Sequence, residues 1–365
     1  MSWREHLRPG IARLSALRPF DYEASTPDLA RLDCNELAFG PSSEELARFA
    51  QTLSGLPLQR YPEMTGRPLR EALAARWQVE PEEILLGNGS VEILGLLMTA
   101  FGAGTRREPP KVLYPAPSFA YYEVVALTHG VVPVTVPLDS EFQLDEARIA
   151  AAIDEARPAL GLFASPNNPS GNRFPALALE RLAKRMDAAF VVDEAYAEFS
   201  GETMLSRVRV VPGLFVLRSL SKIGLAGLRL GALVGEREAI AELDKVRLPW
   251  NVNSVTMALG CAALAQPELL AERVRSVVEL RGDFERALRQ IAGLAVYPSE
   301  ANFILVRVPS DARAVAQQLL REGVLVKDVS APGLLERCLR ITVGIPSENA
   351  RCVEVLSRAL APSLG

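Results

Sequence analysis

The sequence contains few of the residues that build metal sites, disulfide frameworks or histidine-based catalytic triads. It has four cysteines and two histidines in 365 residues. The cysteines show no CxxC spacing, and neither His6 nor His129 has a partner at a spacing typical of a zinc site or a triad. We therefore expect reduced thiols, mostly in the core, no metal site, and surface or capping roles for both histidines.

Long apolar runs and an excess of one charge are also missing. No segment approaches the ~18–20 apolar residues that cross a bilayer, so we expect no membrane association. The first residues, MSWREHLRPGIARL, lack the apolar core and cleavage site of a secretory signal, which predicts a cytoplasmic protein. Forty Lys plus Arg against 44 Asp plus Glu, with both signs interspersed, provide no basic stripe for nucleic acid.

Two phosphate-binding motifs of α/β proteins are absent as well. The chain contains no Gly-Lys pair, which the GxxxxGK[ST] loop of P-loop ATPases requires. No GxGxxG follows any of the strands predicted below, as it would in a Rossmann dehydrogenase. These absences argue against both classes of enzyme.

What is present is a regular alternation of short apolar segments with helical stretches. It predicts an α/β fold with a mostly parallel sheet of seven strands. The predicted strands are 84–87, 111–115, 131–136, 159–166, 189–196, 214–221 and 229–235.

The chain also exceeds the roughly 250–300 residues at which a single core stops growing. Beyond residue 249 a long amphipathic helix, 267–291, precedes strands 302–308, 324–327 and 338–344 and helices 311–322 and 348–360. We therefore predict an N-terminal arm, 1–31, that packs on the small domain or a partner subunit. A large cofactor-binding domain, 32–248, and a small α+β domain, 249–365, follow.

Polar residues follow three predicted strands at their carboxyl ends, where ligands bind in parallel α/β sheets. These segments are SPNNPSG (165–171), DEAY (193–196) and SLSK (219–222). Asp193 comes directly after the apolar run AFVV, and a buried carboxylate requires a cation, such as a protonated pyridine nitrogen. A solvent-facing or helix-capping role also fits Asp193 taken alone.

Lys222 follows an apolar strand and precedes Arg229. A lysine beside apolar surface and another cation is suited to attack an aldehyde and form a Schiff base. Ser219, Ser221, nearby glycine amides and Arg229 are groups that hold a phosphate monoester. A solvated loop lysine is the plain alternative. Together with Asp193 and Asn168, the pattern favours an enzyme that uses pyridoxal 5'-phosphate (PLP).

The segments SLSKIGLAGLRLG, VVDEAY and SPNNPSG resemble the three signatures of the fold-type-I PLP-dependent aminotransferases, in the same order and at similar spacing. The resemblance implies the PLP-dependent transferase fold, with a large seven-stranded domain and a smaller α+β domain. It implies that Lys222 forms the Schiff base, that Asp193 pairs with the pyridine nitrogen, and that Asn168 and Tyr196 hydrogen-bond the phenolic oxygen.

The same resemblance implies a complete cofactor site. Phe119 would stack on the ring, and Ser219, Ser221, Arg229 and Ser90, the last at a helix N-terminus, would hold the phosphate.

Segments over nearly the whole chain further resemble the histidinol-phosphate aminotransferases. They are LDCNE (32–36), RYPEMTG (60–66), LREALA (69–74), DEAYAEF (193–199), GLAGLRLG (224–231), NFILV (302–306) and CLRITVG (338–344). This resemblance implies a homodimer with shared active sites, in which Tyr61 reaches the partner's cofactor phosphate. It also implies a substrate site of Arg340, Lys327 and Asn35. Plain packing for Tyr61 and a surface ion pair for Arg340 are the alternatives.

The implied reaction is a ping-pong transfer of the amino group between histidinol phosphate and 2-oxoglutarate, giving imidazole-acetol phosphate and glutamate. An aromatic amino-acid aminotransferase, a threonine-phosphate decarboxylase-like enzyme and a silent aminotransferase-like binding module remain alternatives. The chain departs from the family at four points. Lys327 replaces an arginine, Val91 replaces an acidic residue, the interval from Lys222 to Arg229 is one residue shorter, and NELAFGPS (35–42) replaces the usual NENP segment.

Overall fold

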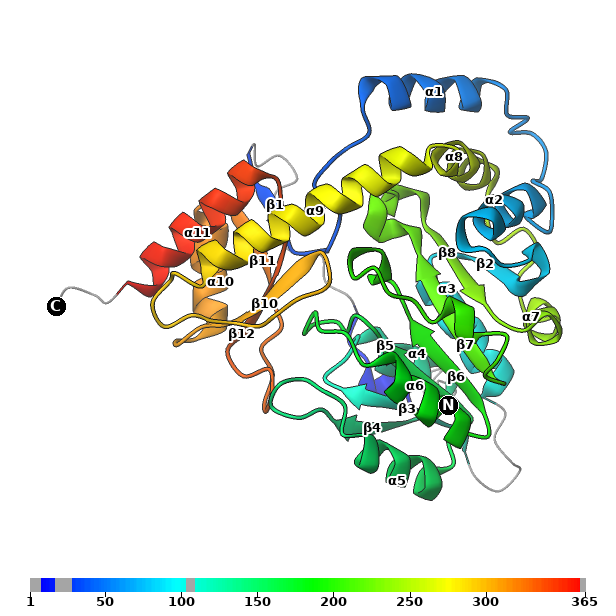
Figure 1. Ribbon diagram of the computed structural model, residues 1–365, viewed down its shortest axis with the longest axis horizontal. Helices are drawn as coiled ribbons and strands as arrows, with labels where there is room; N and C mark the ends of the chain where they lie inside the picture. Colours follow the sequence, from blue (N-terminus) through cyan, green and yellow to red (C-terminus); the bar gives the residue numbers. More distant parts are fainter. Residues whose placement is uncertain (1–7, 17–27, 103–108, 362–365) are drawn as a thin grey trace, which may run out of the picture.

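The computed structural model describes residues 8–16, 28–102 and 109–361. Within them a sheet of seven strands and a sheet of five strands are connected by the long helix α9 (Pro267–Leu288) (Figure 1). Most of the predicted N-terminal arm, and His6 with it, lies outside the described residues. The predicted amphipathic helix 267–291 is confirmed as α9, which ends three residues before the expected end.

The large sheet has the order β2-β8-β7-β6-β5-β3-β4. From β7 to β4 all neighbours are parallel, whereas β8 runs antiparallel to both β2 and β7. The predicted mostly parallel sheet of seven strands is thereby confirmed. The strands are β2 (Ile84–Asn88), β3 (Lys111–Ala116), β4 (Val132–Pro137), β5 (Leu160–Ala164), β6 (Ala189–Asp193), β7 (Leu214–Ser219) and β8 (Leu230–Val234).

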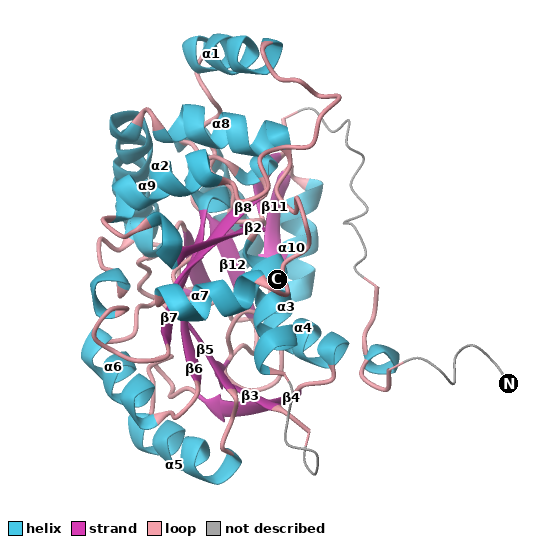
Figure 2. Cartoon of the chain, turned by 90° about the vertical axis from the view of Figure 1, so that its right-hand side faces the viewer, coloured by secondary structure: helices cyan, strands magenta, loops and turns pink. Residues whose placement is uncertain are grey.

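Helices cover both faces of this sheet, as Figure 2 shows edge-on. Every residue of β5, β6, β7 and β8 is buried, which explains why these strands are mostly apolar instead of alternating between apolar and polar residues. Successive side chains point to opposite faces: Val191 belongs to one core cluster and Val192 to the other. The cluster with Val191 packs under α3 (Ser90–Phe101), α4 (Tyr121–His129) and α7 (Arg237–Asp244), and the other under α2 (Arg67–Trp77), α5 (Glu146–Ala156) and α6 (Ala176–Arg185).

The small sheet has the order β1-β11-β12-β10-β9, with α10 (Ala312–Arg321) and α11 (Pro346–Leu360) packed beside it. The predicted strands here are confirmed as β10 (Phe303–Arg307), β11 (Val324–Asp328) and β12 (Cys338–Thr342). Two short strands were not predicted, β9 (Ala295–Val296) and β1 (Ala30–Leu32), the latter pairing in parallel with β11. Both ends of the chain therefore build the small sheet.

Helices α1 (Ser43–Ser54) and α8 (Ser254–Leu264) lie against each other at one end of the molecule, where α1 stands out from the body (Figure 1). Helix α8 also packs on α2 of the large domain. A buried ion pair between Arg273 of α9 and Glu45 fixes the start of α1. The domain boundaries at residues 31 and 248 stay a prediction.

Two negative findings concern the described ranges alone. None of their helices is by itself long and apolar enough to cross a bilayer; only α8 and α9 together, bent by 82°, pass that test of length and composition. In the same ranges, His, Cys, Asp and Glu side chains form no group of three or more able to hold a metal ion.

Candidate active site

The three predicted polar segments meet at one edge of the large sheet. Asp193, at the end of β6, lies in register between Ala164 of β5 and Leu217 of β7. Because these strands are parallel, the segments after β5, β6 and β7 emerge side by side. The strand ends thus bring Asn168, Asp193 and Lys222 into one site, as the sequence predicts.

The Asp193 carboxyl is buried and receives two hydrogen bonds. The hydroxyl of Tyr122 donates to Oδ2 (2.9 Å), and the amide of Ala195 donates to Oδ1 (3.1 Å). Burial raises the pKa of Asp193 to about 6, against the opposing effects of these two donors and of the positive charge on Lys222. The ionised form of a carboxyl in this setting is strongly stabilised by a cation placed next to it.

Lys222 lies on the short helix η6 (Leu220–Ile223), directly after β7. Its Nζ donates to the carbonyl oxygen of Cys34 (3.1 Å) and lies 5.9 Å from the centroid of the Tyr196 ring. The Tyr196 hydroxyl accepts hydrogen bonds from the side-chain amides of Asn35 (2.9 Å) and Asn168 (3.5 Å). One amine, one phenol and two amides are therefore grouped beside Asp193.

A cradle for an anion lies next to Lys222. The Arg229 guanidinium donates to Ser221 Oγ (3.4 Å). A Cβ atom on Gly89 would lie 2.7 Å from Arg229 Nη2, and a Cβ atom on Gly231 would lie 2.6 Å from the amide nitrogen of Ser90. Only glycine permits these approaches, which bring Arg229 to the N-terminus of α3, where free amides favour an anion.

Two more predicted cofactor residues join this arrangement. Ser219 ends β7 in register with Gly231, and so lies beside the cradle. The Phe119 ring packs edge-on against that of Tyr122 (5.6 Å between centroids), whose hydroxyl binds Asp193. The site thus combines a cradle for an anion, an amine, an aromatic ring and a buried carboxyl, and these residues fit PLP.

Arg340 enters the site from β12 of the small sheet. Its Nη1 donates to Asn168 Oδ1 (2.8 Å), and its Nη2 donates to the carbonyl oxygen of Asp33. Within the described part of the chain its buried Nε has no partner, and burial lowers the pKa of the guanidinium. Lys327 pairs in register with Arg340 across the antiparallel β11–β12 ladder, so both side chains lie on one face. Two cations therefore border the site.

Asn35 lies in the left-handed region, with φ of 53°. Its backbone amide donates to Thr342 Oγ1 (3.0 Å), and its backbone carbonyl oxygen accepts from the side-chain amide of Asn302 (3.0 Å). These two contacts hold the Asn35 side chain against Tyr196. Sequence reasoning missed Thr342, Asn302 and Tyr122, although the first two lie within segments that carry the family resemblance.

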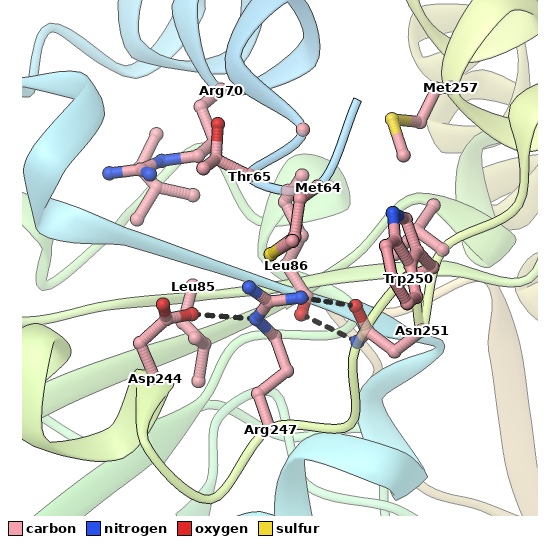
Figure 3. A pocket seen from close by; sticks show the side chains of 13 residues that line it. Met64, Thr65, Arg70, Leu85, Leu86, Asp244, Arg247, Trp250, Asn251 and Met257 are labelled. Carbon is pink, nitrogen blue, oxygen red and sulfur yellow. Dashed lines mark hydrogen bonds and ion pairs between the residues drawn. The ribbon is translucent and has the colours of Figure 1, made fainter. Parts of the chain in front are cut away.

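Tyr61 lies outside this cluster. Its ring stacks on Trp250 (4.4 Å between centroids), and the residue is 78% exposed. Figure 3 shows the hollow beside Trp250, where Arg247 binds Asp244 (2.6 Å) and Asn251 (3.1 Å). The charge of Arg247 is thus matched by the Asp244 carboxylate. The residues that line this hollow do not include Lys222 or the strand end that carries it. The exposed part of Tyr61 is accessible to another molecule.

Comparisons with known proteins show which proteins the chain resembles as a whole. Residues 27–356 match the family model described as "Aminotransferase class I and II". The chain is 40% identical over 354 residues to histidinol-phosphate aminotransferase 2 of Nitrosococcus oceani, covering 96% of each chain. It is 38% identical over 349 residues to the histidinol-phosphate aminotransferase of Aquifex aeolicus, covering 95% of this chain and 97% of the relative. The crystal structure of the histidinol-phosphate aminotransferase from Sinorhizobium meliloti in complex with pyridoxal-5'-phosphate matches with a TM-score of 0.86 and 26% identity, covering 96% of each chain.

Proposed function

The chain belongs to the aminotransferase class I and II family, and on this basis we propose that it is a PLP-dependent histidinol-phosphate transaminase. It would interconvert histidinol phosphate and 2-oxoglutarate with imidazole-acetol phosphate and glutamate. The relatives that carry this activity in their names align over nearly the whole chain. The observation that carries the proposal is the buried Asp193 carboxyl facing Lys222 beside the Ser90–Arg229 cradle.

Each cofactor-binding residue has a distinct task in this proposal. Ser90, Ser219, Ser221 and Arg229 would hold the phosphate, and Phe119 would pack on the ring. Asp193 would keep a proton on the ring nitrogen, because an ionised carboxyl at this buried position is stabilised by a cation. When bound, PLP supplies an electron sink for the negative charge that develops at the substrate Cα.

Proton transfer falls to Lys222. Its amine lies beside the Tyr196 ring, and Tyr196 is itself oriented by Asn35 and Asn168. We assign Lys222 Nζ as the base. It would take the α-proton of the substrate and deliver it to the carbon that was the aldehyde of the cofactor. Tyr196 and Asn168 would hydrogen-bond the phenolic oxygen of the cofactor and fix the tilt of its ring.

Substrate anions would bind to the small domain. The buried Nε of Arg340 has no hydrogen-bond partner among the described residues and could donate to an oxyanion, and Arg340 also contacts Asn168 of the cofactor site. A carboxylate or phosphate there would be placed next to the reacting carbon. Lys327, on the neighbouring strand, adds a second positive charge without the planar fork of an arginine.

We further propose a homodimer with shared active sites. Several large apolar side chains near α1 and Trp250 are exposed, which marks an interaction surface. They are Leu46, Leu53, Leu58, Tyr61, Met64 and Leu248. In the dimer Tyr61 would reach the cofactor phosphate of the other subunit.

A turnover assay tests the substrate assignment. Purified enzyme with PLP is given 2-oxoglutarate together with histidinol phosphate, phenylalanine or threonine phosphate, and glutamate and CO₂ are measured. We expect faster glutamate formation with histidinol phosphate and no CO₂. Faster turnover of phenylalanine by an order of magnitude would point to an aromatic aminotransferase, and CO₂ release from threonine phosphate would point to a decarboxylase.

A further inference from the structure

Tyr122, near the start of α4, is fully buried and its hydroxyl donates to Asp193 Oδ2 (2.9 Å). The two residues lie 71 positions apart in the sequence. Most residues of the core cluster around Tyr122 are apolar, so a phenylalanine ring would fill the same space without a hydroxyl. The hydroxyl therefore calls for an explanation beyond packing.

The ring of Tyr122 is held in one orientation by its neighbours. Phe119 and Tyr114 both pack edge-on against it, each with ring centroids 5.6 Å away. A buried phenol must find an acceptor, and here the acceptor is a carboxylate oxygen shielded from water. Burial also raises the pKa of Tyr122 well above its ordinary value, so the phenol stays protonated and remains a donor.

Both oxygens of Asp193 are thus oriented by the protein, Oδ2 by Tyr122 and Oδ1 by the amide of Ala195. The titratable groups that act on Asp193 are Tyr122 from α4 and Lys222 from η6, while Tyr196 acts on Tyr122. Donors favour the ionised carboxyl against the effect of burial. Each oxygen keeps a further lone pair for a ring N–H.

We propose that Tyr122 is a positioning residue that keeps the Asp193 carboxyl ionised and in one rotamer, aimed at the ring nitrogen of PLP. The inference rests on the proposed function, because it concerns how this site holds its cofactor. Tyr122 acts through Asp193 and touches no reacting atom.

The test compares the full-length enzyme carrying Tyr122→Phe with one carrying Tyr114→Phe. Tyr114 supplies a matched control, since it is a buried phenol packed on the same ring cluster. Three quantities are measured for each protein: the PLP dissociation constant, the pH midpoint of the cofactor's absorption change, and kcat and KM for histidinol phosphate.

Loss of a hydrogen bond to a charged group should weaken PLP binding about ten- to a hundredfold in the Tyr122→Phe enzyme. Its kcat should fall while KM for histidinol phosphate changes little, because Arg340 is untouched. Without the donor Asp193 takes up a proton at higher pH, so the absorption midpoint should move upward. Tyr114→Phe should behave as wild type.

Equal PLP affinity and an unchanged midpoint in the Tyr122→Phe enzyme would overturn the inference. A wild-type protein that binds no PLP would instead refute the proposed function. Should Tyr122→Phe fail to fold, site-specific fluorotyrosine at position 122 preserves packing while strengthening the donor. The midpoint should then move to lower pH, and an unmoved midpoint would contradict the proposal.

Discussion

At the scale of single residues, Asp193 shows how the site trades stability of the cofactor-free protein for binding. Its pKa lies at about 6 in the folded chain, above its ordinary value of 3.8. The folded state therefore binds more protons than the unfolded state between these values, and stability falls as pH rises through this window. Above about pH 6 the ionised carboxyl is buried at a cost that a cationic partner offsets.

We therefore expect Asp193→Asn to stabilise the cofactor-free protein at pH 8 by roughly 1–3 kcal/mol. The gain should shrink toward pH 4, where the wild-type carboxyl is neutral in the folded state. Thermal unfolding across this pH range measures it. The same variant should lose PLP affinity and activity. A difference in stability between Asp193→Asn and wild type that is the same at pH 8 and pH 4 would show that burial of this charge has no such cost.

Some residues of the site could be predicted from the sequence and others could not. Lys222, Asp193 and Asn168 each follow an apolar strand, so the pattern of strands places them together. Tyr122 lies at the start of a helix. Thr342, which accepts a hydrogen bond from the backbone amide of Asn35, is 307 positions away from it. No local pattern reveals such partners, because they are defined by packing between distant segments.

At the scale of elements, a buried ion pair connects β7 to the segment after β6. Arg218 Nη1 binds Glu194 Oε2 (2.9 Å), with both side chains buried and the guanidinium 5.5 Å from the Trp77 ring centroid. Burial raises the pKa of Glu194, and Arg218 opposes this effect. Glu194 directly follows Asp193, so the pair fixes the strand end that carries the cofactor carboxyl.

Arg218→Met should destabilise the protein by about 3–5 kcal/mol, because it leaves the Glu194 charge buried and unpaired. Adding Glu194→Gln should recover part of this loss. The control is Arg185→Met on α6, whose exposed pair with Asp154 contributes about 0–1 kcal/mol. Urea unfolding measures all three variants, and equal effects of Arg218→Met and Arg185→Met would contradict a structural role for the buried pair.

The strands themselves were predictable to different degrees. The seven strands of the large sheet are apolar and long enough to stand out, but the reversed direction of β8 was not predicted. A strand buried on both faces reads the same in either direction, so its sequence does not contain that information. Strands β1 and β9 have three and two residues, too few for any period to appear.

At the scale of the whole molecule, the site belongs to two domains and, by our proposal, to two subunits. Arg340 of the small sheet contacts Asn168 of the large one, so substrate and cofactor residues are coupled within one chain. Tyr61, 78% exposed, lies on the surface that we assign to the dimer. Its role there depends on the second subunit.

Subunit complementation tests this sharing. Tyr61→Ala and Lys222→Ala enzymes should each be nearly inactive alone. Mixed after dissociation and reassembly, they should recover roughly a quarter of wild-type activity, because half the dimers are mixed and each of these contains one intact site. Mixing Lys222→Ala with Asp193→Asn is also expected to give no intact cofactor site and serves as the control. No recovery in the first mixture would place Tyr61 in its own subunit's site, and a Tyr61→Ala enzyme that is fully active alone would place it outside any site.

We propose that Lys222 binds PLP covalently, and borohydride reduction of the PLP-loaded enzyme followed by peptide mapping locates the attached lysine. We expect a stable pyridoxyl group on the peptide that contains Lys222 and no label in the Lys222→Ala enzyme. A label on another lysine, or a protein that acquires none, would contradict it.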